Sequence, residues 1–139
     1  MSQLERAVEI AEAAHRGQVE KNGTPYIEHC HRVARAVETR DEKIVAYLHD
    51  TLEKGHGWSP ERLLEAGFSR SVVSAVEALT KRAGETERAF VQRAASNKLA
   101  RTVKVADLRD NLQQARETGA STERYEEAIK ILEDQFDMM

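Results

Sequence analysis

The 139-residue sequence contains little cysteine, proline or aromatic residue. Its one cysteine, Cys30, has no second cysteine with which to form an internal disulfide. The first residues carry Glu5, Glu9 and Glu12 at positions where a secretory signal peptide would need an unbroken apolar stretch. We therefore expect the chain to act in the cytoplasm.

The sequence also lacks long apolar runs and an excess of positive charge. Its longest apolar run, 44–48, is far shorter than the roughly 20 residues that a membrane-spanning helix needs. The formal net charge is −3 and aromatic residues make up 5%, so neither bulk electrostatics nor base stacking favours a nucleic-acid polymer. Membranes and nucleic-acid polymers are thus not expected partners.

Apolar residues recur at three- and four-residue spacings, which is typical of amphipathic helices. The segment 16–25 contains two glycines, an asparagine and a proline and predicts a loop. No segment alternates with the two-residue period of a strand. Residues 1–139 are therefore expected to form one compact all-α domain. Its helices are expected over 3–15 and about 27–38, from an N-cap at Asp41 to near Gly55, from Ser59-Pro60 to Gly67, after an N-cap at Ser69, after Gly84, over about 97–115, and after an N-cap at Thr122.

Histidine and aspartate follow apolar turns at two places in the chain. His49 and Asp50 come directly after the run 44–48, and Asp107 follows the mainly apolar turn 103–106. A carboxylate at the edge of a core costs several kcal/mol unless it is paired or binds a metal. With His29, these residues could form a site of nitrogen and oxygen ligands with open positions. Such a ligand set suits manganese or iron better than a structural zinc site.

Each of these residues also has an ordinary structural interpretation. His29 could be a capping or solvent-exposed histidine, and the pair 49–50 could form a hydrogen bond that closes a helix. Asp107 could have a capping role or form a salt bridge with Arg101 or Arg109, since structural ion pairs also involve such groups. Spacing alone leaves the two interpretations open.

The other histidines and the cysteine suggest no second site. Cys30 is flanked by two histidines, but adjacent side chains diverge, so we expect a buried small residue and not a nucleophile. His15, His31 and His56 match no metal site by spacing, and surface or capping roles are expected for them.

The order His29, then His49-Asp50, then Asp107 resembles the H…HD…D signature of the HD-domain phosphohydrolases, an all-helical family. More closely, the chain resembles the hydrolase domain of the RelA/SpoT homologues and the small alarmone hydrolases. The matching segments follow the family's order and lie at 14–18, 23–29, 48–53, 78–81 and 103–111. The resemblance spans about residues 7–113 and implies an HD-type helical bundle.

The resemblance implies roles for particular side chains. The four signature residues would hold one divalent metal, usually Mn²⁺ in this family, and Glu53 would orient or deprotonate the attacking water. Asn111 would contact the sugar or a phosphate of the substrate, Tyr26 would line the pocket, and Lys21 could reach a phosphate. The ordinary alternatives are solvent-exposed side chains for Glu53 and Asn111 and a packed ring for Tyr26.

The chain departs from the family at positions that contact substrate. An acidic residue of the family is Lys54 here, which could stabilise developing negative charge, bind a phosphate, or simply be solvated. The family's Arg-Lys pair after the first helix is Glu20-Lys21, and Glu20 would repel a phosphate. The family's Ala-Asp-Arg-Leu-His-Asn reads Ala-Asp-Leu-Arg-Asp-Asn at 106–111. The metal ligands are thus retained more fully than the substrate contacts.

The leading hypothesis is a manganese-dependent hydrolase that removes the 3′-pyrophosphate from guanosine tetraphosphate-type alarmones. A second is an HD hydrolase of another nucleotide or phosphoester, suggested by Glu20 and Lys54. A third is a non-catalytic sensor of metal or nucleotide, suggested by the altered pair Glu53-Lys54. The oligomeric state is not predicted, because the apolar last helix with 138–139 could pack within the chain or against a partner.

Overall fold

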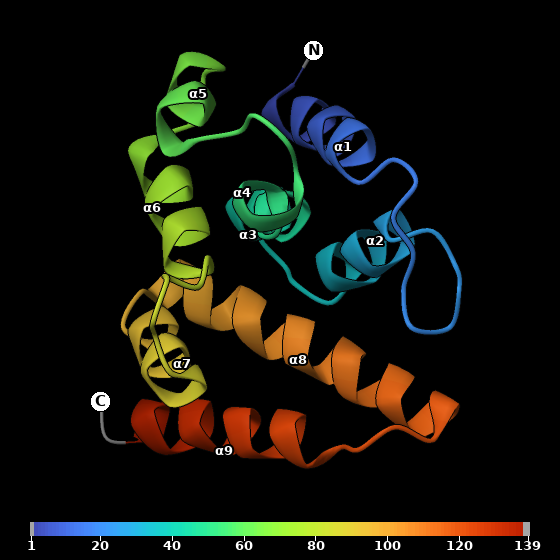
Figure 1. Cartoon of the computed structure of the whole chain (residues 1–139). Helices are drawn as coiled ribbons and strands as arrows, with labels where there is room; N and C mark the ends of the chain where they lie inside the picture. The colour runs from blue at the N-terminus through green and yellow to red at the C-terminus, as the bar shows by residue number, and fades with distance from the viewer. Residues whose placement is uncertain (1, 138–139) are drawn as a thin grey trace.

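The computed structural model describes the backbone of residues 2–137 and the side chains of residues 2–135. Within these residues the chain forms nine helices, and one isolated extended bridge joins Val19 to Pro25 (Figure 1). The expected all-α architecture is confirmed. The helices are α1 (Gln3–Ala14), α2 (Ile27–Arg35), α3 (Arg40–Leu48), α4 (Thr51–Lys54), α5 (Pro60–Glu65), α6 (Arg70–Ala78), α7 (Glu87–Ala95), α8 (Lys98–Thr118) and α9 (Glu123–Asp137).

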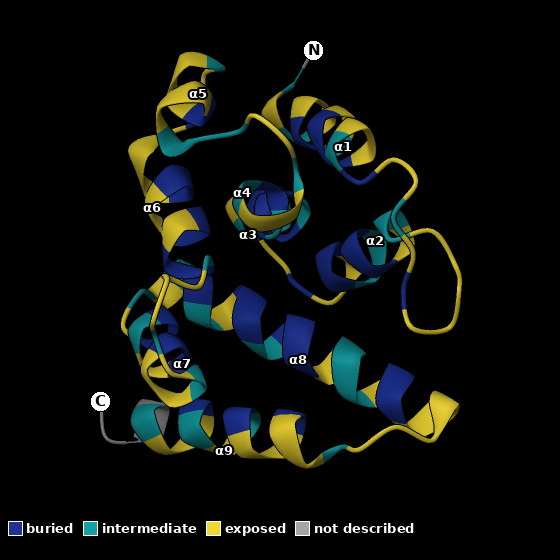
Figure 2. Cartoon of the chain, viewed as in Figure 1, coloured by how far each residue is buried: buried dark blue, intermediate teal, exposed yellow. Residues whose placement is uncertain are grey.

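Helix α3 lies in the middle of the molecule, and α1, α2, α6 and α8 pack around it. Figure 2 shows the buried surfaces of α1, α2 and α6 turned toward this helix. Ile44, Val45, Ala46 and Leu48 are at most 1% exposed. Burial of apolar area contributes about 25 cal/mol per Å² to stability, so these side chains hold α3 firmly in the core. The position of α3 in turn fixes the position of the residues that follow it.

Helix α8 runs below α2 and α3 in Figure 1 and belongs to two apolar clusters. Ala100, Val103 and Ala106 join the core around α3, whereas Leu108 joins a second cluster with α7 and α9. Asp107 lies between these two sets of residues, so α8 carries a carboxylate into the middle of the bundle. Within residues 2–137, no helix combines the length and the apolar character that a membrane span requires.

Side-chain caps confirm most of the predicted helix starts. Ser59, Ser69 and Asn97 each accept a hydrogen bond from a main-chain N–H three residues further on, at the starts of α5, α6 and α8. Such caps satisfy N–H groups that have no partner in the first turn. The segment 138–139, considered above for packing, lies outside the described residues.

Helix α3 differs from the prediction at both ends. Its N-cap is Thr39 and not Asp41, because Thr39 and Glu42 form a reciprocal capping box that starts the helix earlier. The predicted continuous helix to Gly55 is broken at His49 and Asp50, and the short α4 follows the break. This break places both side chains at the end of a buried helix.

Helix α2 ends three residues before the predicted end, at Arg35. The ammonium group of Lys43 donates hydrogen bonds to the carbonyl oxygens of Ala34 and Val37, at 2.9 and 2.8 Å. A lysine from α3 thereby satisfies main-chain oxygens at the end of α2. Residues 36–38, which were predicted to be helical, therefore belong to the connection between α2 and α3. The side chain of Lys43 holds this connection.

Substituting Gly55 by alanine should destabilise the fold, because α1 and α4 approach closely at this glycine. A Cβ atom at position 55 would lie 2.7 Å from the carbonyl oxygen of Thr51 and 2.9 Å from the Cβ of Ala14. We expect Gly55→Ala to lower the free energy of unfolding by about 1–3 kcal/mol in chemical denaturation. Ser74→Ala, on an exposed face of α6, should change it by less than about 0.5 kcal/mol. Equal stability of the two variants would contradict this explanation.

Candidate metal centre

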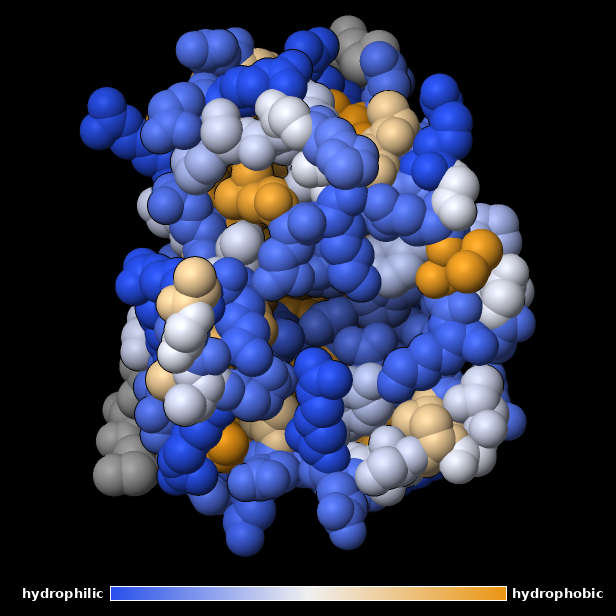
Figure 3. Space-filling view, in the orientation of Figure 1, coloured by the Kyte–Doolittle hydropathy of each residue, from blue (hydrophilic) through white to orange (hydrophobic). Residues whose placement is uncertain are grey.

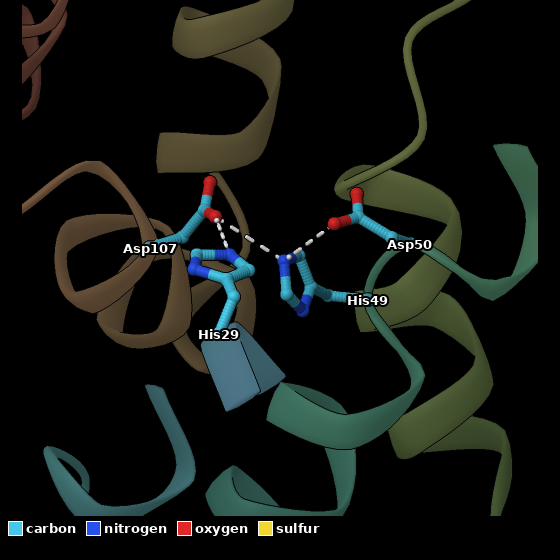
Figure 4. Close-up of side chains that lie close together, drawn as sticks. All are labelled: His29, His49, Asp50 and Asp107. Carbon is cyan, nitrogen blue, oxygen red and sulfur yellow. Dashed lines mark hydrogen bonds and ion pairs between the residues drawn. The ribbon is translucent and has the colours of Figure 1, made fainter. Parts of the chain in front are cut away.

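Four side chains that are far apart in the sequence converge beside the end of α3 (Figure 4). His29 comes from the first turn of α2 and Asp107 from the middle of α8. His49 and Asp50 occupy the break between α3 and α4. One possible ligand atom from each residue lies within 4.8 Å of the others. The structure thus brings together the four residues that the sequence suggested as metal ligands.

The four groups contact one another directly. His29 Nε2 lies 2.9 Å from Asp107 Oδ1, and His49 Nε2 lies 3.2 Å from the same oxygen. His49 Nε2 is also 3.0 Å from Asp50 Oδ2. Lys104, one turn earlier on α8, places its Nζ 3.4 Å from Asp107 Oδ2. Since both rings are almost fully buried, the cluster is an internal polar site and not a surface ion pair.

The hydrogen bonds of the two imidazoles leave the same ring nitrogen facing the cluster. His49 Nδ1 lies 2.6 Å from the carbonyl oxygen of Ala46, which can only accept, so Nδ1 carries the proton in the neutral ring. His29 Nδ1 lies 2.6 Å from a carboxylate oxygen of Asp110. Nε2 of both rings is then available as a ligand. Two such nitrogens with the two carboxylates of the cluster fit a divalent ion.

Burial and charge act in opposite directions on these groups. Burial by itself would lower the pKa of His49, but the charges of Asp50 and Asp107 raise that pKa well above its ordinary value. Burial would likewise lower the pKa of His29, but hydrogen bonds with Asp107 and Asp110 raise it. Burial would raise the pKa of Asp50, yet the charge of His49 lowers it. The site therefore keeps its carboxylates ionised and attracts positive charge.

A cavity of about 360 Å³ opens over the cluster, and Figure 3 shows the surface hollowed near the middle of this face. Its walls carry rings as well as charges, from α4, α7, α8 and α9 and from the loop before α2. A group with negative charge, such as a phosphate, can be paired by cations at such a surface. The cavity is lined by cations, by carboxylates outside the cluster and by rings: the cations are Lys21, Lys54, Lys81, Lys104 and Arg124, the carboxylates are Glu20, Glu53 and Glu87, and the rings include Tyr26, Phe90 and Tyr125.

The side chains that the sequence suggested for catalysis or substrate binding all line this cavity. Tyr26 donates its hydroxyl hydrogen to Asp50, and Lys54 Nζ lies 4.1 Å from the centre of the Tyr26 ring. Asn111 donates to Asp107 Oδ1 at 3.4 Å. Tyr26 and Asn111 are therefore tied to the carboxylates of the cluster itself.

Glu53 and Lys21 each contact another part of the cavity wall. Glu53 Oε1 accepts a hydrogen bond from the main-chain N–H of Lys81 at 3.0 Å, which connects α4 to the segment after α6. Lys21 donates to the hydroxyl of Tyr125 and lies 4.7 Å from the centre of that ring. Lys21 thus links the loop before α2 to α9 across the cavity.

Glu20 behaves differently from the sequence expectation. Its side chain is 1% exposed and forms an ion pair with Arg32, so it is not an unpaired charge that repels a phosphate. Sequence analysis also missed Asp110 and Lys104, which contact His29 and Asp107. The three-residue spacing of Lys104, Asp107 and Asp110 places them on one face of a helix and could have revealed them.

The remaining histidines and the cysteine take structural positions. His15 is the C-cap of α1, as expected, but it is buried instead of lying at the surface, and its Nδ1 is 2.9 Å from Gln18 Oε1. His31 is partly buried and His56 is exposed. Cys30 is fully buried, and burial raises the pKa of its thiol to about 12. The prediction of a buried, non-nucleophilic cysteine is consistent with this environment.

Known proteins resemble this chain in both sequence and structure. The probable GTP pyrophosphokinase of Mycobacterium leprae (strain TN) is 32% identical over 129 residues, which cover 84% of this chain and 16% of that protein. The chain thus spans a small part of the length of that relative. One solved structure is described as "A metazoan ortholog of SpoT hydrolyzes ppGpp and plays a role in starvation responses". It aligns with a TM-score of 0.76 and 25% identity, over 96% of this chain and 85% of that chain.

The model of one protein family, described as "HD domain", matches residues 7–113. This match covers most of the chain and includes each of the four clustered residues. The protein belongs to the HD domain family.

Proposed function

We propose that this protein is a metal-dependent phosphohydrolase and that its leading substrate is a guanosine tetraphosphate-type alarmone, from which it removes the 3′-pyrophosphate. The observation that carries the proposal is the buried cluster of imidazoles and carboxylates at the floor of a cavity whose wall carries several cations as well as carboxylates. The likeness to a solved SpoT ortholog, a protein described as one that hydrolyzes ppGpp, supports this substrate. A cytoplasmic location is part of the proposal.

We assign the metal to His29, His49, Asp50 and Asp107, and we propose Mn²⁺ because mixed imidazole and carboxylate ligands suit it. A bound divalent ion supplies a water of lowered pKa and polarises a phosphoryl oxygen. The chain contributes ionised carboxylates in a buried setting and Nε2 atoms freed by their Nδ1 hydrogen bonds. Lys104 stabilises the charge of Asp107 from the other side.

The remaining roles are proposed from the family resemblance, and the position of each residue in the cavity supports them. Glu53, held by the main chain of Lys81, is assigned to orient the attacking water and accept its proton. Lys54 and Lys21 are assigned to phosphate oxygens, because ammonium groups pair well with them. Asn111 is assigned to the sugar or a phosphate. Tyr26 would line the substrate pocket while its hydroxyl holds Asp50 in place.

A second candidate function is hydrolysis of another nucleotide or phosphoester by the same site. The observation that favours it is the ion pair of Glu20 with Arg32. Glu20 stands where the resembling family has an arginine, and a carboxylate cannot stack on a base as a guanidinium does. Recognition of guanine would then depend on other side chains.

Purified protein supplied with Mn²⁺ should release pyrophosphate from guanosine tetraphosphate. Asp107→Ala should lose Mn²⁺ binding and turnover, because it removes a ligand and leaves His29 and His49 without their shared acceptor. Asp134→Ala, which changes an exposed aspartate of α9, is the matched control and should keep both. Preferential turnover of deoxynucleoside monophosphates or phosphodiesters would select the second candidate. Nucleotide binding without turnover would contradict an enzymatic function and indicate a sensor.

The affinity for Mn²⁺ should increase with pH, because each imidazole must lose a proton before Nε2 can bind an ion. The pKa values of His29 and His49 are raised in the metal-free protein, so proton release extends above the ordinary value of about 6.5. Those raised pKa values stabilise the metal-free fold fully below about pH 6.5, and the contribution is lost as pH rises through them. Calorimetric titration in buffers of different ionisation enthalpy measures the Mn²⁺ affinity and the proton release, and chemical denaturation of the metal-free protein at several pH values measures its stability. Affinity that is independent of pH, with no proton release, would contradict the assignment.

Replacing Lys54 by alanine should lower kcat/KM about ten- to a hundredfold, because hydrogen bonds to charged groups contribute about 1.5–3 kcal/mol. The Lys54 carbonyl, which accepts from Gln18 at 2.8 Å, is unaffected by the change. Lys130→Ala, at an exposed lysine of α9, serves as control. Steady-state kinetics of Lys54→Ala equal to those of the control would show that Lys54 makes no productive contact with the substrate.

A further inference from the structure

The two histidines of the cluster are oriented by different kinds of group. His49 Nδ1 contacts a main-chain carbonyl oxygen within its own helix, at Ala46. His29 Nδ1 contacts a side chain from another helix, with Asp110 Oδ2 at 2.6 Å. The ring of His29 therefore lies between two carboxylates of α8, because its Nε2 contacts Asp107. The orientation of His29 depends on residues that substitution can change.

Helix geometry accounts for this arrangement. Asp107 and Asp110 are three residues apart on α8, and His29 and Arg32 are three residues apart on α2. Residues at this spacing lie on one face of a helix. The two faces meet, so each carboxylate of α8 finds a donor on α2.

The carboxylate of Asp110 is held from several directions. Arg32 Nε lies 2.7 Å from Oδ1 and Arg32 Nη2 lies 3.1 Å from Oδ2, which is a two-pronged contact. Gln114, one turn further along α8, donates to Oδ2 at 3.0 Å. Arg32 also pairs with Glu20 from the loop before α2. A carboxylate with this many partners has little freedom to rotate, which holds the imidazole that it contacts.

Glu20, His29 and Asp110 are close enough to suggest a second cation site, since their possible ligand atoms lie within 4.8 Å of one another. The guanidinium of Arg32 already pairs with both of these carboxylates. It supplies the positive charge that a second metal would bring. The surplus of one negative charge in Glu20, Arg32 and Asp110 remains beside His29.

We propose that Asp110, clamped by Arg32, is a positioning residue that holds the Nδ1–H of His29 and thereby presents Nε2 to the metal. The inference rests on the metal site of the proposed function. A carboxylate that accepts from the outer nitrogen of a metal-bound imidazole fixes the ring and makes its inner nitrogen a stronger donor. Glu20 and Gln114 support the clamp through their contacts with Arg32 and Asp110.

The chain offers a matched control for this role. Arg93 forms a two-pronged contact with Glu85, at 2.8 and 2.9 Å, between α7 and the segment before it. The side chains of Glu85 and Asp110 are 12% and 13% exposed. Glu85→Gln and Asp110→Asn therefore remove the same charge from similar ion pairs. Of these two carboxylates, Asp110 is the one that contacts a histidine of the cluster.

The test is calorimetric titration of the full chain with Mn²⁺. Asp110→Asn should bind Mn²⁺ about ten- to a hundredfold more weakly than the unchanged protein, as is usual for loss of such a partner. Glu85→Gln should stay within about twofold. Thermal melting of both variants measures the loss of fold stability that removal of the carboxylate charge causes in each. Equal Mn²⁺ affinity in Asp110→Asn and Glu85→Gln would overturn the inference.

A second readout needs no turnover. In protein loaded with Zn²⁺ as a diamagnetic probe, the Nδ1 proton of His29 should give a strongly downfield proton resonance that Asp110→Asn shifts upfield. An unchanged resonance would overturn the inference. If Asp110→Asn does not fold, Arg32→Lys, which keeps the charge but loses the two-pronged contact, should weaken Mn²⁺ binding more than Arg93→Lys does.

The outcomes separate this inference from the proposed function. Unchanged protein that binds Mn²⁺ but hydrolyses no phosphoester would end the proposed function and leave the role of Asp110 standing. Full activity with unchanged Mn²⁺ affinity in Asp110→Asn would overturn the role of Asp110 and leave the proposed function standing. Absence of metal binding by the unchanged protein would overturn both.

Discussion

The buried carboxylate of Asp107 dictates how the helices around the site pack. One of its oxygens contacts both His29 and His49, and the other faces Lys104. A buried carboxylate is tolerated only when such partners are in place. Helices α2 and α8 and the end of α3 must therefore meet at this point, and the apolar residues of α8 on either side of Asp107 bury the helices that do so. The packing that forms the core therefore also assembles the site.

Two departures from the resembling family, separate along the sequence, are joined in the structure. Glu20 and Asp110 both pair with Arg32, and Asp110 contacts His29. A change at one of these positions therefore alters the electrostatic environment of the other. The altered residues thus contact a common arginine beside the cluster, while the four residues of the cluster itself are retained.

Helix α9 lies beyond the part of the chain that matches the family model, yet it contributes to the cavity. Tyr125 is buried in the cluster formed with α7 and α8, and its hydroxyl accepts from Lys21. Arg124 lines the same cavity. Helix α9 thus forms one side of the cavity with residues that lie outside the matched segment 7–113. The side chains of α9 therefore affect which substrate fits the cavity.

The helical class could be predicted from the sequence, because apolar spacing and side-chain caps such as Ser59 act over a few residues. The cost of placing a carboxylate such as Asp107 beside a core made a metal site one of two open interpretations, and the resemblance of the residue order to the HD signature selected it. The break after α3 at 49–50, the burial of Glu20 and the contact of Asp110 with His29 depend on how the helices pack and could not be predicted from local sequence. That contact joins residues 81 positions apart, and local periodicity carries no information about which distant face a helix meets.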